Sequence, residues 1–156
     1  MDEKYPASVN GALVLVAARL SLALSNHCES NRVGLCVGPA AVVWGENELQ
    51  PDIEVLPLGS YRRGIQWEQM PNPLLVVEVL SPFGVSASRD FVLKRKAYLK
   101  RGIREYWVVD HEKRRVHVWS GGQPEQIVTD VLRWRPTPTI APFEIRLAQL
   151  FGPEGG

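Results

Sequence analysis

Two acidic residues, Asp52 and Glu78, adjoin apolar runs that have the composition of β-strands. Glu78 interrupts residues 74–80, a run that is otherwise continuously apolar and therefore typical of a strand covered on both faces. A carboxylate in such a strand is costly to bury without a cation, a hydrogen-bond partner or a solvent-filled cleft. Taken alone, Glu78 is explained equally well by structural pairing with one of the 18 basic residues.

Asp52 follows Pro51 at the start of a second predicted strand, residues 52–56. If the two strands are neighbours, Asp52 and Glu78 converge on one hard cation such as Mg²⁺ or Mn²⁺, which prefers oxygen ligands. A cation held there activates water and offsets charge on a phosphoryl oxygen, which is the usual physical route to phosphodiester hydrolysis. Pro-Asp pairs are common at turns, so this spacing alone is a weak indication.

The helices that must position these residues follow from apolar periodicity. Apolar residues at steps of three and four predict an N-terminal amphipathic helix with Ser8 as its N-cap. Its apolar face comprises Val9, Leu13, Val16, Leu20 and Leu24. A second helix is expected over residues 88–101, capped by Ser88 and ended by Gly102.

The remaining apolar runs predict strands separated by turn-forming residues. These strands are residues 33–37, 40–44, 52–56, 74–80, 105–110 and 115–119, of which the last two form a hairpin. The proline-containing tail from residue 124 is expected to add an edge strand and a covering segment. This order of elements predicts an α/β fold in which two helices flank a mixed β-sheet.

Length and composition favour one soluble, cytoplasmic domain. A chain of 156 residues is the usual size of a domain, and its 18 basic and 17 acidic residues give no overall attraction to nucleic acid or membranes. Its two cysteines form no C-x-x-C pair, so a disulfide scaffold is not indicated. The most apolar stretch, residues 11–24, is shorter than the ~20 residues that span a bilayer and contains Arg19. We therefore expect neither a membrane segment nor a secretion signal.

The sequence around both acidic residues resembles the Uma-two family of restriction endonucleases. The resemblance covers residues 50–151 and is carried by Pro51-Asp52, residues 75–82, Asp90, Lys94, Tyr98 and residues 102–110. It implies a single domain over residues 1–156 with the PD-(D/E)XK (restriction-endonuclease-like) core, N-terminally short relative to the family. It also implies metal-dependent cleavage of DNA, with Asp52 and Glu78 as ligands of Mg²⁺ or Mn²⁺.

The sequence departs from the superfamily pattern two residues after Glu78, where Leu80 stands in place of the usual lysine. In Uma-two relatives this lysine is found on the following helix, at the position that corresponds to Lys94. Asp90, Lys94 and Tyr98 recur every four residues and therefore share one side of a helix. The alternative is a solvated basic helix, because other lysines and arginines surround Lys94.

Other candidate residues carry less weight. An acidic ligand that precedes the first helix in many relatives is expected to be missing, and the candidate substitutes are Glu46, Glu48 and Glu54. Acidic residues beside loops are normally solvated, so we expect all three at the surface. His111 and His117, which flank the predicted hairpin turn, are expected to face solvent, and the five tryptophans are expected in the core or an interface.

The sequence thus leads to the hypothesis of a metal-dependent DNA endonuclease. The expected metal ligands are Asp52, Glu78 and the carbonyl of Val79, and Lys94 is expected to steady the attacking water or the developing charge. The expected supporting residues are Ser81, Asp90 and Tyr98, and the expected phosphate contacts are Arg62, Arg63, Arg95 and Lys96. The alternative is a catalytically impaired nuclease fold that binds nucleic acid or protein, as a homodimer through its tryptophan-bearing strands.

Overall fold

The computed structural model describes the backbone of residues 7–38, 42–44, 47–49, 51–60, 71–80 and 85–153. Side chains are described for residues 11–38, 51–60, 71–80 and 92–153. In chain order the elements are α1 (Ala7–Ser30), β1 (Gly34–Val37), β2 (Val42–Trp44), β3 (Asn47–Leu49), β4 (Ile53–Pro57), β5 (Leu75–Val79), α2 (Val85–Arg101), β6 (Glu105–Asp110), β7 (Arg115–Ser120), β8 (Gln126–Val128), β9 (Val131–Trp134), β10 (Phe143–Arg146) and α3 (Leu147–Phe151).

The described strands form one large mixed sheet and two small ones. Six of these strands make up the large sheet, in the order β1-β4-β5-β6-β7-β8. The central strands β5 and β6 are parallel and are connected through α2, whereas the other neighbouring pairs are antiparallel. β9 pairs with β10, and β2 with β3, in separate two-stranded sheets. The expected mixed sheet with flanking helices is confirmed.

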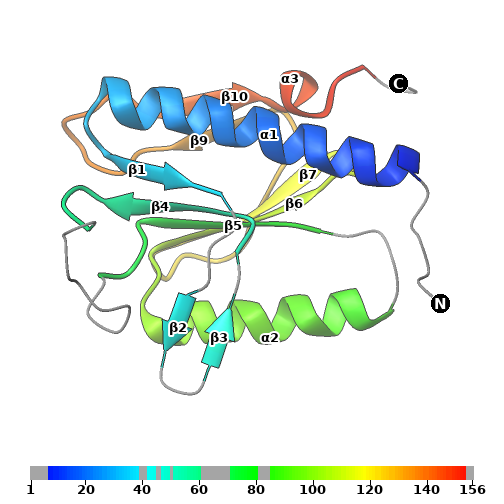
Figure 1. Ribbon diagram of the computed structural model, residues 1–156, viewed down its shortest axis with the longest axis horizontal. Coiled ribbons are helices and arrows are strands. Elements are labelled where there is room, and N and C mark those ends of the chain that lie inside the picture. The colour runs from blue at the N-terminus through cyan, green and yellow to red at the C-terminus, as the bar shows by residue number, and fades with distance from the viewer. Residues whose placement is uncertain are drawn as a thin grey trace.

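The large sheet lies between two layers, as Figure 1 shows. α1 lies on one face together with β9, β10 and α3, and α2 covers the other face. Each face buries its own apolar cluster, and alternation along β6 sends Trp107 to the α1 side and Tyr106 to the α2 side. The tryptophans with described side chains are all buried, as expected: Trp107, Trp119 and Trp134. Trp44 and Trp67 lie outside the described side chains.

α1 packs on the sheet through the apolar stripe that its sequence predicts. Val16, Leu20 and Leu24 are buried, whereas Leu13 is half-buried and Val9 lies outside the described side chains. The helix begins at Ala7, so Ser8 lies inside its first turn and the predicted N-cap is wrong. A cap contributes only about 1 kcal/mol, so a cap-forming residue does not by itself fix where a helix begins.

α1 is also longer than its most apolar stretch. By length and composition alone, Gly11–Ser30 could cross a membrane, a test that the core helix of a soluble protein also passes. In the fold, one side of this segment belongs to the core beside the sheet. The other side leaves Val14, Leu15 and Leu22 exposed.

α2 begins at Val85 and ends at Arg101. Ser88 therefore lies within the helix, and its predicted role as the N-cap is wrong. The predicted end is confirmed, because Gly102 adopts a φ of 94°, in the left-handed region that favours glycine. The backbone N–H of Ile103 then donates to the carbonyl of Tyr98 at 3.1 Å, which closes the last turn and returns the chain to the sheet as β6.

The C-terminal tail supplies an edge strand and a covering layer, as expected. β8 forms an edge of the large sheet, and residues of β9, β10 and α3 join the core on the α1 side. The expectation that His111 and His117 face solvent is met only in part, because both are half-buried. His111 lies against Phe151, and His117 stacks on Trp119 and pairs with Glu125. These partners come largely from the tail, so the hairpin sequence alone does not reveal them.

Gly34 is a position at which the sheet requires glycine. A Cβ atom added there would overlap the backbone carbonyl oxygen of Leu56 on β4 and lie 3.2 Å from Cγ1 of Val55. We expect Gly34→Ala to lower the free energy of unfolding in urea by about 1–3 kcal/mol or more. Gly11→Ala is the matched control, because nothing lies within 4 Å of an added Cβ in α1. Alanine there should add about 0.5–1 kcal/mol, and equal stability of the two variants would contradict the close pairing of β1 with β4.

Candidate active site

Asp52 and Glu78 lie side by side where β4 begins and β5 ends. The β4–β5 register pairs Ile53 with Val77, so the next residues outward are Asp52 on one strand and Glu78 on the other. Side chains alternate along a strand, and Glu78 contacts α2 through Tyr98. Both carboxylates therefore face the side of the sheet that α2 covers.

The backbone of β5 holds Asp52 in place. The N–H of Val79 donates a hydrogen bond of 2.7 Å to Oδ2 of Asp52. This bond fixes one carboxylate oxygen beside the residue that follows Glu78. The N–H and C=O of a strand residue point to the same edge, so the carbonyl of Val79 is directed to the Asp52 side as well.

Two residues of α2 reach Glu78, which is only 9% exposed. The Tyr98 hydroxyl donates to its Oε1 at 3.0 Å, and Nζ of Lys94 lies 3.8 Å from its Oε2. Lys94 and Tyr98 are four residues apart, so they reach Glu78 from the same side of the helix. Both carboxylate oxygens of Glu78 therefore have a partner on α2.

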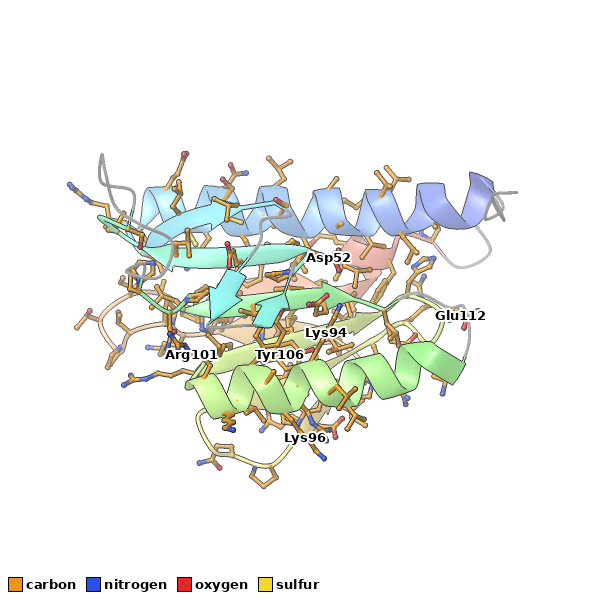
Figure 2. The ribbon with its side chains drawn as sticks, turned by 60° about the horizontal axis from the view of Figure 1, so that its bottom comes forward. Asp52, Lys94, Lys96, Arg101, Tyr106 and Glu112 are labelled. Atoms are coloured by element: carbon orange, nitrogen blue, oxygen red, sulfur yellow. The ribbon has the colours of Figure 1, made fainter. Side chains whose placement is uncertain are left out.

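Lys94 brings its ammonium group from α2 to the Glu78 carboxylate. Leu80, two residues after Glu78, packs instead against the apolar cluster beside α2. Figure 2 shows Lys94 extending from α2 toward the strands, whereas Lys96 leaves the helix on the opposite side. The Lys94 side chain keeps 27% exposure, so it is partly accessible from solvent.

Glu78 has too little positive charge nearby to keep its pKa at the ordinary value of a carboxylate. Burial raises the pKa of Glu78 to about 7, and the negative charge of Asp52 adds to the increase. Lys94 and the Tyr98 hydroxyl act in the opposite direction, because both favour the ionised carboxylate. A further positive charge beside Asp52 and Glu78 would lower this pKa and keep Glu78 ionised.

Glu54 does not lie where the sequence predicts it. We expected it at the surface, but in β4 it is only 2% exposed, and burial raises its pKa to about 7. It lies two residues after Asp52 and so faces the same side of the sheet. Alternation along the predicted strand 52–56 was the signal that could have placed it there. Glu46 and Glu48 lie outside the described side chains.

The other predicted site residues are only partly described. Arg95 lies over the Trp119 ring, with its guanidinium carbon 5.3 Å from the ring centroid, and Lys96 is exposed. Asp90 belongs to α2, one turn before Lys94. The predicted residues outside the described side chains are Arg62, Arg63, Ser81 and Asp90.

The donor set fits a hard divalent cation. Asp52 and Glu78 offer carboxylate oxygens at one strand edge, and the Val79 carbonyl points to the same edge. Within the described part of the chain, no three His, Cys, Asp or Glu side chains lie close enough together to hold a metal ion. Two carboxylates completed by backbone oxygen and water suit Mg²⁺, which gives up its water reluctantly.

The raised pKa of Glu54 predicts that its ionisation destabilises the metal-free protein. Below about pH 4.5 the residue is protonated in both the folded and the unfolded chain. As the pH rises, the unfolded chain ionises first, so the folded state loses on the order of 3 kcal/mol by the time the pH exceeds about 7. Glu54→Gln should therefore exceed the wild type in stability above pH 7, and the advantage should shrink toward pH 4.5. Urea unfolding in EDTA measures the difference in stability between Glu54→Gln and the wild type. A difference that does not change with pH would contradict the raised pKa of Glu54.

Comparison with known proteins reports on both family and fold. Residues 6–148 match the Uma2 family, described as "Putative restriction endonuclease". No curated protein matches the chain. Among solved structures, the chain is similar to "a putative nuclease belonging to DUF820" from Anabaena variabilis ATCC 29413, with a TM-score of 0.69 and 18% sequence identity. The superposition covers 97% of this chain and 84% of that one, and at this identity it shows the fold alone.

These findings confirm the resemblance seen in the sequence and the restriction-endonuclease-like fold. The family match includes both strands that carry the paired carboxylates and the helix that carries Lys94. Because it spans residues 6–148 of 156, this chain belongs to the Uma2 family of restriction-endonuclease-like proteins.

Proposed function

We propose that this protein is a divalent-metal-dependent endonuclease that hydrolyses phosphodiester bonds in DNA. The observation that carries the proposal is the meeting of Asp52 and Glu78 where β4 begins and β5 ends, with Lys94 3.8 Å from the Glu78 carboxylate. Phosphodiester hydrolysis needs an activated water and positive charge near the phosphoryl oxygens. Membership of the Uma2 family supports the nuclease class.

The proposed cation ligands are Asp52, Glu78 and the backbone carbonyl of Val79. When bound, a divalent cation makes water a stronger nucleophile and offsets charge on a phosphoryl oxygen. The Val79 N–H and the Tyr98 hydroxyl each hold one carboxylate oxygen, at 2.7 and 3.0 Å. These two hydrogen bonds orient Asp52 and Glu78 before any ligand arrives, which reduces the reorganisation that binding requires.

Lys94 supplies positive charge where a phosphate group can approach. Its Nζ lies 3.8 Å from Oε2 of Glu78, which is longer than a direct hydrogen bond. The ammonium group of this partly exposed side chain can therefore donate to a phosphoryl oxygen or to the attacking water while it remains beside Glu78. Arg62, Arg63, Arg95 and Lys96 remain the proposed contacts for more distant phosphates.

Cleavage of plasmid and single-stranded DNA with Mg²⁺ or Mn²⁺ tests this function. We expect Asp52→Asn, Glu78→Gln and Lys94→Met each to reduce the rate by at least about 100-fold, because each removes a charge used at the reacting phosphate. Glu144→Gln is the matched acidic control, since Glu144 is exposed and pairs with Arg133 on the small β9–β10 sheet. It should cut at the wild-type rate, and EDTA should abolish cutting.

Two outcomes would contradict the nuclease proposal. Equal residual cutting by all variants would identify a contaminating nuclease as the source of activity. DNA binding by the wild type without cutting in either metal would favour the alternative, an impaired nuclease fold that acts as a binding module.

Salt dependence of DNA affinity tests the proposed phosphate contacts. Removing one cation that binds a phosphate should reduce the slope of log affinity against log salt by about one. We expect Lys96→Ala to weaken binding and to reduce this slope, whereas Arg133→Ala, which removes an exposed cation from β9, should leave both unchanged. A slope that Lys96→Ala does not alter would remove Lys96 from the DNA-binding surface.

A further inference from the structure

Glu54 has a feature that the paired carboxylates lack. It is 2% exposed, and its Oε2 has no hydrogen-bond partner among the residues whose side chains the structure describes. An unpartnered polar atom at such depth is rare in folded proteins and costs about 1–3 kcal/mol, more for a charged group. Asp52 and Glu78, by comparison, accept hydrogen bonds from Val79 and Tyr98. The described contacts therefore give no structural reason for a glutamate at this position.

The geometry directs Glu54 to the same side of the sheet as the paired carboxylates. It is two residues from Asp52 on the same strand, and the β4–β5 register pairs it with Val76, two residues before Glu78. Val76 belongs to the cluster beside α2. Tyr98, which donates to Glu78, also lies within electrostatic reach of Glu54. Glu54 thus lies beside the paired carboxylates, two residues further along the chain than Asp52, on the side of the sheet that α2 covers.

The charges at this location favour a divalent cation. When ionised, Asp52, Glu54 and Glu78 carry three negative charges, and Lys94 is the cation that the described residues place beside Glu78. When the positive charge of Lys94 is subtracted, two negative charges remain, and one divalent cation offsets them. In the described ranges, no three such side chains are placed to bind a metal together, so Glu54 is not assigned as a third direct ligand.

We propose that Glu54 is an outer carboxylate of the cation site and that it acts on the ion through water. The inference rests on the proposed function, because it takes Asp52 and Glu78 as the direct ligands. A cation that keeps part of its water shell presents water hydrogens to surrounding acceptors. The unpartnered Oε2 of Glu54 is an acceptor of this kind. Such outer partners orient the inner shell, and their loss typically weakens metal affinity about 10-fold to 100-fold.

Calorimetric titration of Mn²⁺ into the purified protein tests the proposal without reference to cleavage. The variants are Glu54→Gln and Glu54→Met, which remove the charge at nearly constant volume, and Asp52→Asn, which removes a direct ligand. Glu105→Gln is the matched control, because Glu105 is also a buried strand glutamate, held by Ser120 and Trp107. Thermal unfolding in EDTA confirms that each variant is folded.

We expect Asp52→Asn to abolish measurable Mn²⁺ binding and both Glu54 variants to raise the Kd at least about 10-fold. Glu105→Gln should bind Mn²⁺ as the wild type does. If Asp52→Asn loses binding while both Glu54 variants retain the wild-type Kd, the role of Glu54 is refuted and the proposed function stands. If the wild type binds no Mn²⁺, or Asp52→Asn binds it normally, the proposed function fails and this inference fails with it.

Discussion

The carboxylate of Glu78 lies buried at the end of a central strand, and its negative charge requires a positive charge or a hydrogen-bond donor nearby. An isolated ionised carboxylate is unstable in an apolar setting. α2 meets this requirement with Lys94 and Tyr98, which lie 3.8 and 3.0 Å from the two carboxylate oxygens. The helix is available at this position because it connects the parallel strands β5 and β6 and so crosses the face of the sheet. The crossover connection therefore serves the site as well as the core.

The arrangement concentrates more negative charge than the described residues neutralise. Burial raises the pKa of both Glu54 and Glu78 to about 7, and Asp52 adds to the effect on Glu78. The metal-free fold therefore loses stability as the pH rises from about 4.5 to above 7. A ligand that binds only the folded state stabilises it, so cation binding would couple stability to function. Buried groups that destabilise the fold are common at functional sites, where a ligand compensates for them.

Much of the fold is predictable because its central strands carry strong apolar signals. The predicted strand 105–110 coincides with β6, and the hairpin with β7 follows from the short turn between two β-rich runs. The beginnings of α1 and α2 are not predictable, because a plausible cap such as Ser88 contributes little energy. Within the site, Asp52 and Glu78 could be named from the sequence. The depth of Glu54 could not, because it depends on the packing around β4, which lies between β1 and β5, rather than on neighbouring residues in the sequence.

Anomalous diffraction from a crystal soaked in Mn²⁺ tests the central claim most directly. The account predicts a single strong anomalous peak where β4 begins and β5 ends, about 2.0–2.6 Å from oxygens of both Asp52 and Glu78. Water between that peak and Glu54 would agree with the outer role of this residue. A crystal in which Mn²⁺ is absent from this position, with the two carboxylates turned apart or neutralised by arginine, would contradict the account.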